Sequence, residues 1–244
     1  MKQSLFEIID NIPLTADVMK MRLRGDTSEI TAPGTFVNIK LDGLFLRRPI
    51  SVCDVEGDVL TIIYKAVGRG TEQMREMKSG MLDVLTGLGN GYDTSKSGDR
   101  PLLLGGGVGV PPMYMLAKRL IAEGKKVSVI LGFNKESEVF CEDDFKALGA
   151  DVTVTTVDGS YGVKGFVTDA MRDTDYTYFY TCGPEPMLKA IYAASATSGQ
   201  FSFEERMGCG FGACMGCSCK TVTGYKRICK DGPVLEKEEI LWEN

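Results

Sequence analysis

The sequence contains no histidine among its 244 residues. Histidine is the side chain most often used as a general base near neutral pH, and its imidazole is a common metal ligand. Its absence excludes Ser-His-Asp and Cys-His catalysis, His-ligated zinc sites and Rieske-type iron–sulfur centres. The chemistry of this chain therefore depends on other side chains or on bound groups.

The sequence also lacks long hydrophobic runs and an excess of positive charge. No segment approaches the roughly 18 consecutive apolar residues of a membrane-spanning helix. The N-terminal segment MKQSLFEIID has neither the basic nor the apolar region of a secretory signal. The 28 basic and 33 acidic residues give a formal charge of −5, which provides no basic surface for nucleic acid. These absences predict a soluble, cytoplasmic protein that binds neither membranes nor nucleic acid.

The first part of the chain, residues 1–98, is rich in short β-type runs separated by Gly, Asp, Asn and Pro. These runs predict strands over residues 4–9, 17–23, 35–41 and 59–67. One helix is expected over residues 71–78, with Thr71 as its N-cap. Several short strands with a single helix predict a small antiparallel β-barrel.

Between residues 99 and 198 strands alternate with helices, a pattern typical of βαβ units and a parallel sheet. The predicted strands cover 101–107, 126–133, 151–157 and 176–183, and the predicted helices 111–124, 141–150, 165–173 and 184–196. Residues 199–244 are too few for a core of their own unless a bound group stabilises them. The chain is thus predicted to be a multi-domain α/β and β protein, with a β-barrel, a parallel-sheet nucleotide-binding domain and a small C-terminal module.

The C-terminal module is marked by its cysteines, five of the eight in the chain. Four of them follow the pattern C-x4-C-x2-C-x11-C, namely Cys209, Cys214, Cys217 and Cys229. The first two spacings match a plant-type [2Fe–2S] site, in which four thiolates hold two irons. A tetrahedral zinc site is the alternative, although zinc sites usually pair two short Cys knuckles. Cys219 is not needed for this pattern, but it is an alternative ligand to Cys217 or Cys229.

The barrel region carries an Arg-Pro-Ile-Ser motif, Arg48-Pro49-Ile50-Ser51, placed by the sequence after a strand. A guanidinium with a hydroxyl three residues later suits a pyrophosphate. Gly70-Thr71 opens the predicted helix, whose N-terminal amides favour the same anion. The strand residues Ile63-Tyr64-Lys65 lie between the two motifs. An Arg-Pro pair at a strand edge without any ligand is the alternative interpretation.

A glycine-rich segment, with Gly105, Gly106, Gly107 and Gly109, joins a predicted strand to a predicted helix. Glycines there allow a diphosphate to approach the backbone closely. Pro112 occupies the place of the third glycine of the G-x-G-x-x-G fingerprint, so a standard Rossmann site is not indicated. A glycine-rich turn without a ligand is the alternative.

The last predicted strand of this domain ends in Cys182-Gly183-Pro184. Because the carboxyl ends of parallel strands face the ligand crevice, Cys182 is expected near a bound nicotinamide. A buried structural cysteine is the alternative. Three acidic residues, Glu142, Asp143 and Asp144, are expected to accept from ribose hydroxyls and so to favour NAD over NADP. The alternative is that they are solvated charges capping a helix.

The order of these motifs resembles that of the ferredoxin–NADP reductase superfamily and, within it, the electron-transfer subunits of the NAD-dependent (class 1B) dihydroorotate dehydrogenases. The resemblance implies FAD bound by Arg48 to Ser51, Ile63 to Lys65, Gly70 and Thr71, and a [2Fe–2S] cluster bound by Cys209, Cys214, Cys217 and Cys229. It implies NAD at Gly105 to Gly107, Gly109 and Cys182 to Pro184. It divides the chain into an FAD-binding barrel (1–98), an NAD-binding domain (99–198) and a cluster module (199–244).

The resemblance further implies a heterotetramer, two copies of each chain, with an FMN-containing catalytic subunit that oxidises dihydroorotate in pyrimidine biosynthesis. Electrons would pass from that FMN through the cluster and FAD to NAD⁺, without an acid–base catalytic residue in this chain. The same motifs fit the corresponding subunit of a ferredoxin-dependent NADP reductase, a sulfide dehydrogenase or a hydrogenase diaphorase. A non-catalytic, zinc-stabilised regulator that senses nucleotide is an alternative of another class.

Overall fold

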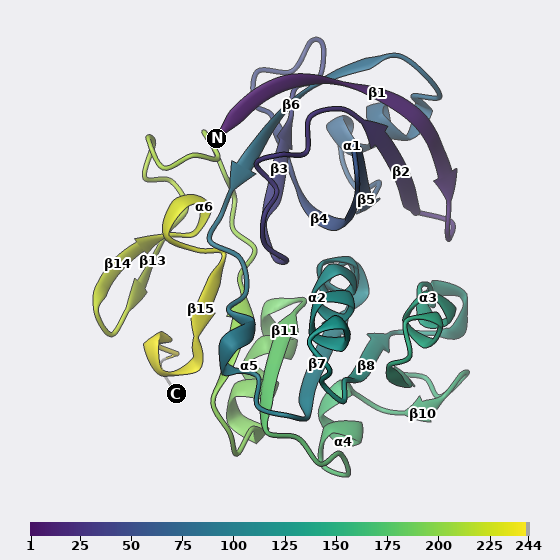
Figure 1. Ribbon diagram of the computed structural model, residues 1–244, viewed down its shortest axis with the longest axis vertical. Helices are drawn as coiled ribbons and strands as arrows, with labels where there is room; N and C mark the ends of the chain where they lie inside the picture. The colour runs from purple at the N-terminus through teal and green to yellow at the C-terminus, as the bar shows by residue number, and fades with distance from the viewer. Residues whose placement is uncertain (243–244) are drawn as a thin grey trace.

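The computed structural model describes residues 1–242, and these form a barrel, a large sheet with helices on both faces, and a cysteine-rich segment at one side (Figure 1). The barrel is closed and antiparallel, with strand order β1-β2-β5-β4-β3-β6. Its elements are β1 (Lys2–Pro13), β2 (Val18–Arg24), β3 (Phe36–Ile39), β4 (Arg48–Glu56), β5 (Val59–Lys65), α1 (Arg69–Glu76) and β6 (Met81–Leu88).

The barrel closes because each strand places every second side chain in a common apolar interior. Phe6, Met21, Leu23, Leu60 and Ile62 are fully buried there. The closed barrel has six strands, whereas the sequence predicted four of them. One unpredicted strand is β6, and the other is β4. The Arg-Pro-Ile-Ser motif comes after β3 along the chain, and it also forms the first residues of β4, a strand that was not predicted.

Helix α1 begins two residues before the predicted N-cap. Gly68 is the residue preceding the helix, and Thr71 occupies the third helical position. The Thr71 hydroxyl accepts hydrogen bonds from the backbone N–H groups of Val67 and Gly68, at 3.0 and 3.2 Å. The prediction of Thr71 as N-cap was therefore wrong by position, although its hydroxyl does satisfy N–H groups at the start of the helix.

Asn11 fastens the other end of α1 to the barrel. Its Nδ2 donates to the carbonyls of Met74 and Met77, at 2.8 and 2.9 Å. Its Oδ1 accepts from the Tyr64 hydroxyl at 3.1 Å. Asn11 is 5 % exposed, so water does not replace these bonds when the amide is lost.

The second part is a seven-stranded sheet with order β10-β9-β8-β7-β11-β12-β15, parallel except for the edge strand β15. Its elements are β7 (Pro101–Gly106), α2 (Pro111–Ala122), β8 (Ser128–Phe133), α3 (Glu142–Ala147), β9 (Asp151–Thr156), β10 (Val163–Lys164), α4 (Val167–Met171), β11 (Tyr178–Cys182), α5 (Glu185–Ala194), β12 (Gly199–Ser202) and β15 (Val234–Glu236). The predicted alternation of strands and helices is present.

Alternate residues of β7 bury two different faces of this sheet. Leu103 packs with α2 and α3, whereas Leu102 and Leu104 pack with α4 and α5. Both faces are covered, as a parallel sheet requires. All three leucines are fully buried.

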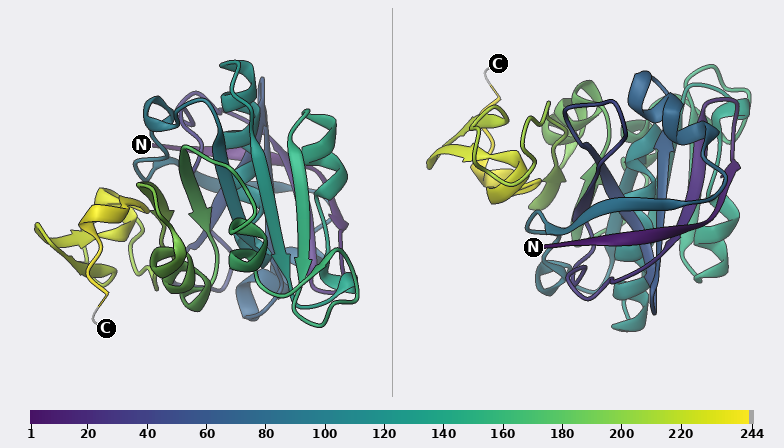
Figure 2. Two further views of the ribbon diagram at one scale, coloured as in Figure 1. Left: turned by 90° about the horizontal axis from the view of Figure 1, so that it is seen from below. Right: turned by 90° about the horizontal axis from the view of Figure 1, so that it is seen from above.

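The cysteine-rich segment leaves the sheet after β12 and returns to it as β15, so it projects from the sheet edge (Figure 2). It contains the hairpin of β13 (Ser218–Thr221) and β14 (Gly224–Arg227), followed by α6 (Ile228–Asp231). The boundary expected between residues 198 and 199 falls just before β12, which pairs with β11 rather than with the cysteine segment.

Helix α2 lies between the barrel and the sheet. The Lys118 ammonium contacts Asp54 and Glu56 of β4, at 2.8 and 2.9 Å. Cys53 of the same strand joins the apolar cluster around α2. The barrel and the sheet therefore share one packed interface. Within residues 1–242, no helix has the length and apolarity needed to cross a bilayer.

We expect Asn11→Ala to loosen α1 without unfolding the barrel. Two helix carbonyls and the Tyr64 hydroxyl would lose their partners, and hydrogen exchange of residues 69–77 should be about 30-fold faster, corresponding to about 2 kcal/mol. Hydrogen–deuterium exchange read by mass spectrometry measures this. Glu76→Ala is the control, because Glu76 is exposed on the same helix. Equal exchange in the two variants would contradict the role given to Asn11.

Candidate functional site

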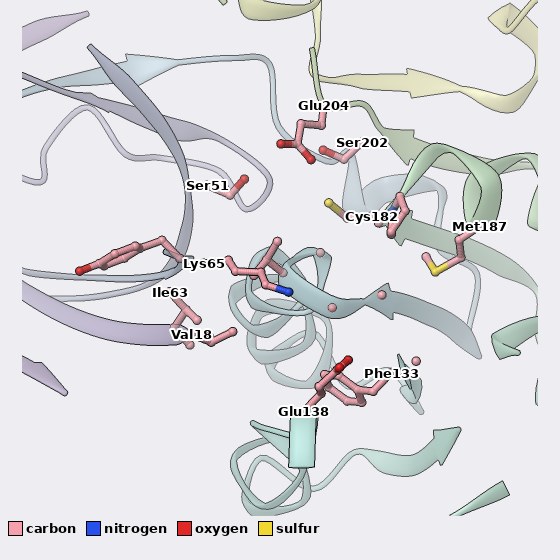
Figure 3. Close-up of a pocket in the computed structure, with 18 of the residues that line it drawn as sticks. Val18, Ser51, Ile63, Lys65, Phe133, Glu138, Cys182, Met187, Ser202 and Glu204 are labelled. Carbon is pink, nitrogen blue, oxygen red and sulfur yellow. The ribbon is translucent and has the colours of Figure 1, made fainter. Parts of the chain in front are cut away.

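A cavity of about 880 Å³ lies between the barrel and the carboxyl ends of the sheet strands (Figure 3). Its volume is in the upper range for sites of small molecules and cofactors. Residues predicted as two separate sites line this one cavity: Arg48, Pro49, Ile50, Ser51, Ile63, Tyr64, Lys65, Thr71, Gly106, Gly107, Gly109, Cys182, Gly183 and Pro184. Of the predicted residues, Gly70 and Gly105 do not line the cavity. The structure thus brings the barrel motifs and the glycine-rich segment together.

The Arg-Pro-Ile-Ser motif and the start of α1 are in direct contact. A Cβ added to Gly70 would lie 2.1 Å from Nε of Arg48, so only glycine leaves room for the guanidinium. Arg48 also donates from Nη1 to the Leu46 carbonyl at 2.5 Å. A cation is thereby held against the N-terminus of a helix, and both features favour the same anion.

The side chains of β5 divide between the cavity and the barrel interior. Ile63 and Lys65 point towards the cavity in Figure 3, and Lys65 pairs with Asp17 at 3.0 Å. Tyr64 instead packs in the barrel core, where burial raises the pKa of its hydroxyl to about 12. Because Tyr64 donates to Asn11, its side chain supports the barrel, and it can contribute to a ligand only through its backbone.

The glycine-rich segment is pressed against the end of β11. A Cβ on Gly109 would lie 2.2 Å from the Cys182 carbonyl oxygen, and one on Gly106 would lie 2.4 Å from the Met187 sulfur. Gly107 has φ +52°, a conformation that favours glycine. These constraints bring the backbone after β7 to the cavity wall at the start of α2, where N–H groups favour phosphate.

Cys182 lies at the end of β11 opposite Ser202 of β12, and both line the cavity with Glu204 (Figure 3). Burial raises the pKa of Cys182 to about 12, although a hydrogen bond with Ser202 acts in the opposite direction. The thiol is therefore neutral near pH 7. Ser202 and Glu204 were missed in the sequence, because β12 was not recognised as a further parallel strand whose carboxyl end reaches the crevice.

The acidic residues expected at the ribose do not line the cavity. Glu142 accepts from Lys146 at 2.6 Å and from the Tyr161 hydroxyl at 2.9 Å, so it belongs to a surface network of α3. The acidic side chain at this end of the cavity is Glu138, which accepts from Nδ2 of Asn134 at 2.9 Å. The prediction for residues 142–144 was wrong because it relied on their nearness in sequence to β8. The chain reaches the cavity earlier, at Glu138, and residues 142–144 belong to α3.

The four cysteines of the predicted cluster form two pairs. Cys209 lies beside Cys214, and Cys217 lies beside Cys229. The Cys209 sulfur accepts from the N–H groups of Ala213 and Cys214 at 3.2 and 3.4 Å, and the Cys217 sulfur accepts from the N–H of Cys229 at 3.4 Å. A [2Fe–2S] cluster takes two protein ligands on each iron, so two thiol pairs on one loop fit it.

The backbone also favours a thiolate in this loop. Burial acts to raise the pKa of Cys209, but the backbone of Phe211, Cys214 and Ala213 and the Cys214 side chain outweigh it and lower the pKa to about 6. At Cys229, by contrast, burial and the neighbouring Cys217 raise the pKa to about 12. A thiolate is the form that binds iron. Within residues 1–242 no three Cys, Asp or Glu side chains gather at a site for a single ion.

Cys219 follows Cys217 by two residues and packs against the same apolar cluster. It is half-buried on β13, where burial raises the pKa of its thiol. It lines a second cavity of about 840 Å³ together with Phe203 and Trp242.

A closed antiparallel barrel beside a doubly covered parallel sheet, with one cavity at their junction and paired thiols next to it, defines an oxidoreductase of the ferredoxin–NADP reductase fold. Solved structures agree. A structure described as an NADH-dependent reduced ferredoxin-NADP oxidoreductase is 29% identical with a TM-score of 0.89, covering 98% of this chain and 90% of that chain. A ferredoxin NADP⁺ reductase from Neisseria gonorrhoeae shares the fold at 18% identity and a TM-score of 0.70, over 80% and 90%.

Sequence comparison identifies the family. The model for the iron-sulfur cluster binding domain of dihydroorotate dehydrogenase B matches residues 204–241, and that for the oxidoreductase NAD-binding domain matches residues 103–192. The dihydroorotate dehydrogenase B (NAD(+)) electron transfer subunit of Fusobacterium nucleatum is 45% identical, covering 95% of each chain. That of Bacillus pumilus is 42% identical, covering 98% of each. The chain belongs to this family of electron transfer subunits, as the motifs indicated. The family name implies a partner catalytic subunit.

We expect Gly109→Ala to impair the use of NADH selectively. The added methyl would displace the glycine-rich segment from the Cys182 carbonyl, and a displacement of this size lowers turnover with NADH about 100-fold. NADH oxidation with an artificial acceptor is the measurement. Gly149→Ala is the control, because it strains a positive φ but meets no atom within 4 Å. Unchanged kinetics in the Gly109 variant would show that this contact does not shape the site.

Proposed function

We propose that this chain relays electrons from a partner subunit to NAD⁺ in pyrimidine biosynthesis, with FAD in the cavity and a [2Fe–2S] cluster on the cysteine loop. The observation that carries this proposal is the single cavity in which the barrel motifs, the glycine-rich segment and Cys182 meet. FAD, once bound, accepts or donates a hydride at a nicotinamide and exchanges single electrons with an iron–sulfur cluster. We further propose three functional units, over 1–98, 99–198 and 199–244, in the cytoplasm.

The barrel side of the cavity is assigned to FAD. Arg48 is placed to fork onto the pyrophosphate, with the α1 amides facing the same charge. Gly70 leaves space for that guanidinium, and Thr71 orders the backbone at the start of the helix. The full proposed set is Arg48, Pro49, Ile50, Ser51, Ile63, Tyr64, Lys65, Gly70 and Thr71.

The sheet side is assigned to NAD. The proposed set is Gly105, Gly106, Gly107, Gly109, Cys182, Gly183 and Pro184. Cys182 stands near the nicotinamide as a neutral thiol, because its raised pKa keeps it protonated at physiological pH. Glu138 is placed to accept from ribose hydroxyls in the role first expected of residues 142–144. The described cationic residues of the cavity wall are Arg48 and Lys65, both on the barrel, which supports NAD over NADP.

The cluster is assigned to Cys209, Cys214, Cys217 and Cys229. Backbone N–H groups that already point at Cys209 and Cys217 would stabilise negative charge on the ligand sulfurs. The loop supplies all four ligands, so the partner need not contribute one.

The proposed partner is an FMN-containing subunit that oxidises dihydroorotate, in a complex with two copies of each chain. Exposed apolar side chains lie on the cysteine loop and on the loop before β4, and apolar side chains that gather on a surface mark sites of protein contact. Phe45 is 100% exposed, and Phe211 and Met215 are 45% and 54% exposed. Contact at this face would bring the partner close to the thiol pairs.

We expect Cys229→Ser to lose the iron and acid-labile sulfide of the protein, because a hydroxyl replaces one of the four thiolates. Cys219→Ser is the matched control and should retain both. Iron, zinc and sulfide analysis of the purified variants decides between the assignments. Full iron and sulfide in the Cys229 variant would overturn the ligand set, and zinc in place of iron in the unmodified protein would overturn the cluster itself.

The proposed function is tested by NADH formation from dihydroorotate and NAD⁺. This chain alone should oxidise NADH with artificial acceptors but should form no NADH from dihydroorotate. Addition of an FMN-containing dihydroorotate dehydrogenase subunit should confer NAD⁺-dependent turnover. Turnover by this chain alone would refute the division of labour. Absence of turnover with such a partner would instead favour a related electron-transfer complex.

A further inference from the structure

Asn38 joins the flavin side of the barrel to the cysteine loop through one side chain. It lies on β3 directly opposite Pro49 of β4, in the middle of the Arg-Pro-Ile-Ser motif. Its Nδ2 donates to the carbonyl of Cys209, the first cysteine of the cluster pattern, at 3.2 Å. Asn38 is 1% exposed, so this contact is shielded from water.

The cysteine loop rests directly on the Asn38 amide. Gly210 follows Cys209 with φ +78°, and a Cβ at this position would lie 2.3 Å from Nδ2 of Asn38. Any other residue at 210 would force the loop and the amide apart. The loop is therefore fitted to Asn38 by shape as well as by the hydrogen bond.

Hydrogen bonds from Arg47 hold the barrel backbone in place at Asn38. Arg47 donates to the Asn38 carbonyl at 3.2 Å, and its Nη1 and Nη2 both donate to Oδ1 of Asp83, at 3.0 and 2.9 Å. Arg47 directly precedes β4, so these bonds connect the start of that strand to β3 and β6, where the loop docks. Movement of the Asn38 amide relative to the Arg-Pro-Ile-Ser motif is thus restricted.

A contribution to the stability of the barrel does not explain why position 38 is an asparagine. Its Oδ1 is buried and has no hydrogen-bond partner among residues 1–242. A buried acceptor left unpaired costs more free energy than one ordinary hydrogen bond returns. An apolar side chain at 38 would avoid that cost but would lose the donor to Cys209.

We infer that Asn38 is a positioning residue that fixes the separation and orientation of the cysteine loop relative to the flavin site. The inference rests on the proposed function, since it presumes the two bound groups. Asn38 touches neither the dinucleotide segment nor the thiols themselves, so its loss leaves four sulfur ligands and the Arg48 contact in place. Its effect is on the order of the loop and on electron passage between the two groups.

The test compares the loaded protein with Asn38→Leu and with Thr86→Val. Thr86 is a fully buried barrel residue that donates to the Lys2 carbonyl and does not contact the loop. Asn38→Leu should keep its iron and FAD, broaden the electron paramagnetic resonance signal of the reduced cluster, and slow cluster reduction by NADH about tenfold, because a small misplacement of the reacting groups lowers the rate. Thr86→Val should match the unmodified protein. An unchanged signal and rate in Asn38→Leu would overturn the inference.

A second pair of variants decides the matter if Asn38→Leu does not fold. Gly210→Ala directs its methyl at the Asn38 amide, whereas Gly212→Ala carries a similar positive φ but meets the flexible Lys230 side chain. The Gly210 variant should disturb the cluster signal and the transfer rate more than the Gly212 variant. Equal effects would overturn the inference. Absence of iron or FAD from the unmodified protein would instead reject the proposed function.

Discussion

Helix α2 packs on the sheet with one side and on strand β4 of the barrel with the other, and both walls of the cavity take their positions from this contact. A register shift in the β4–β5 ladder between Val52 and Asp54 marks a bulge at Cys53, which joins the apolar cluster around the helix. Lys118 then pairs with Asp54 and Glu56 at the rim. The glycine-rich segment leads directly into the N-terminus of the same helix, so the helix connects the barrel wall of the cavity to the glycine-rich wall.

Cysteine serves two opposite purposes in this chain. Burial raises the pKa of Cys53 well above its usual range, and it raises those of Cys141 and Cys182 to about 12, so these thiols stay protonated and behave as small apolar groups. Around Cys209 the backbone N–H groups outweigh burial and favour the thiolate. The difference arises from the groups that surround each sulfur, because the residue type is the same.

The motifs that carry local chemistry were readable from the sequence, and features that depend on distant pairing were not. The cysteine spacing, the glycine-rich segment and the Arg-Pro-Ile-Ser motif all reflect short-range requirements. Strand β12 escaped prediction because four residues give little pattern, and its partner β11 lies elsewhere in the chain. Glu204 follows β12 and was missed with it.

Side-chain direction was equally beyond the sequence. Tyr64 and Lys65 are neighbours in one motif, yet the alternation of a strand sends the tyrosine into the barrel core. Glu138 and Glu142 are separated by one short turn, and only the path of the chain after β8 decides that the first reaches the cavity. Asn38 carries no motif, and its contact with Cys209 spans 171 positions.

The cysteine segment is inserted between two adjacent strands, since β12 precedes it and β15, which pairs with β12, follows it. This order has a consequence for biosynthesis. The ribosome releases β15 only after all the cysteines, so the edge of β12 stays unpaired until the whole insertion has been made. An unpaired edge strand is prone to pair with other chains. Completion of the sheet is therefore coupled to correct folding of the insertion, and a chain whose cysteine segment misfolds would expose a surface that chaperones and proteases recognise.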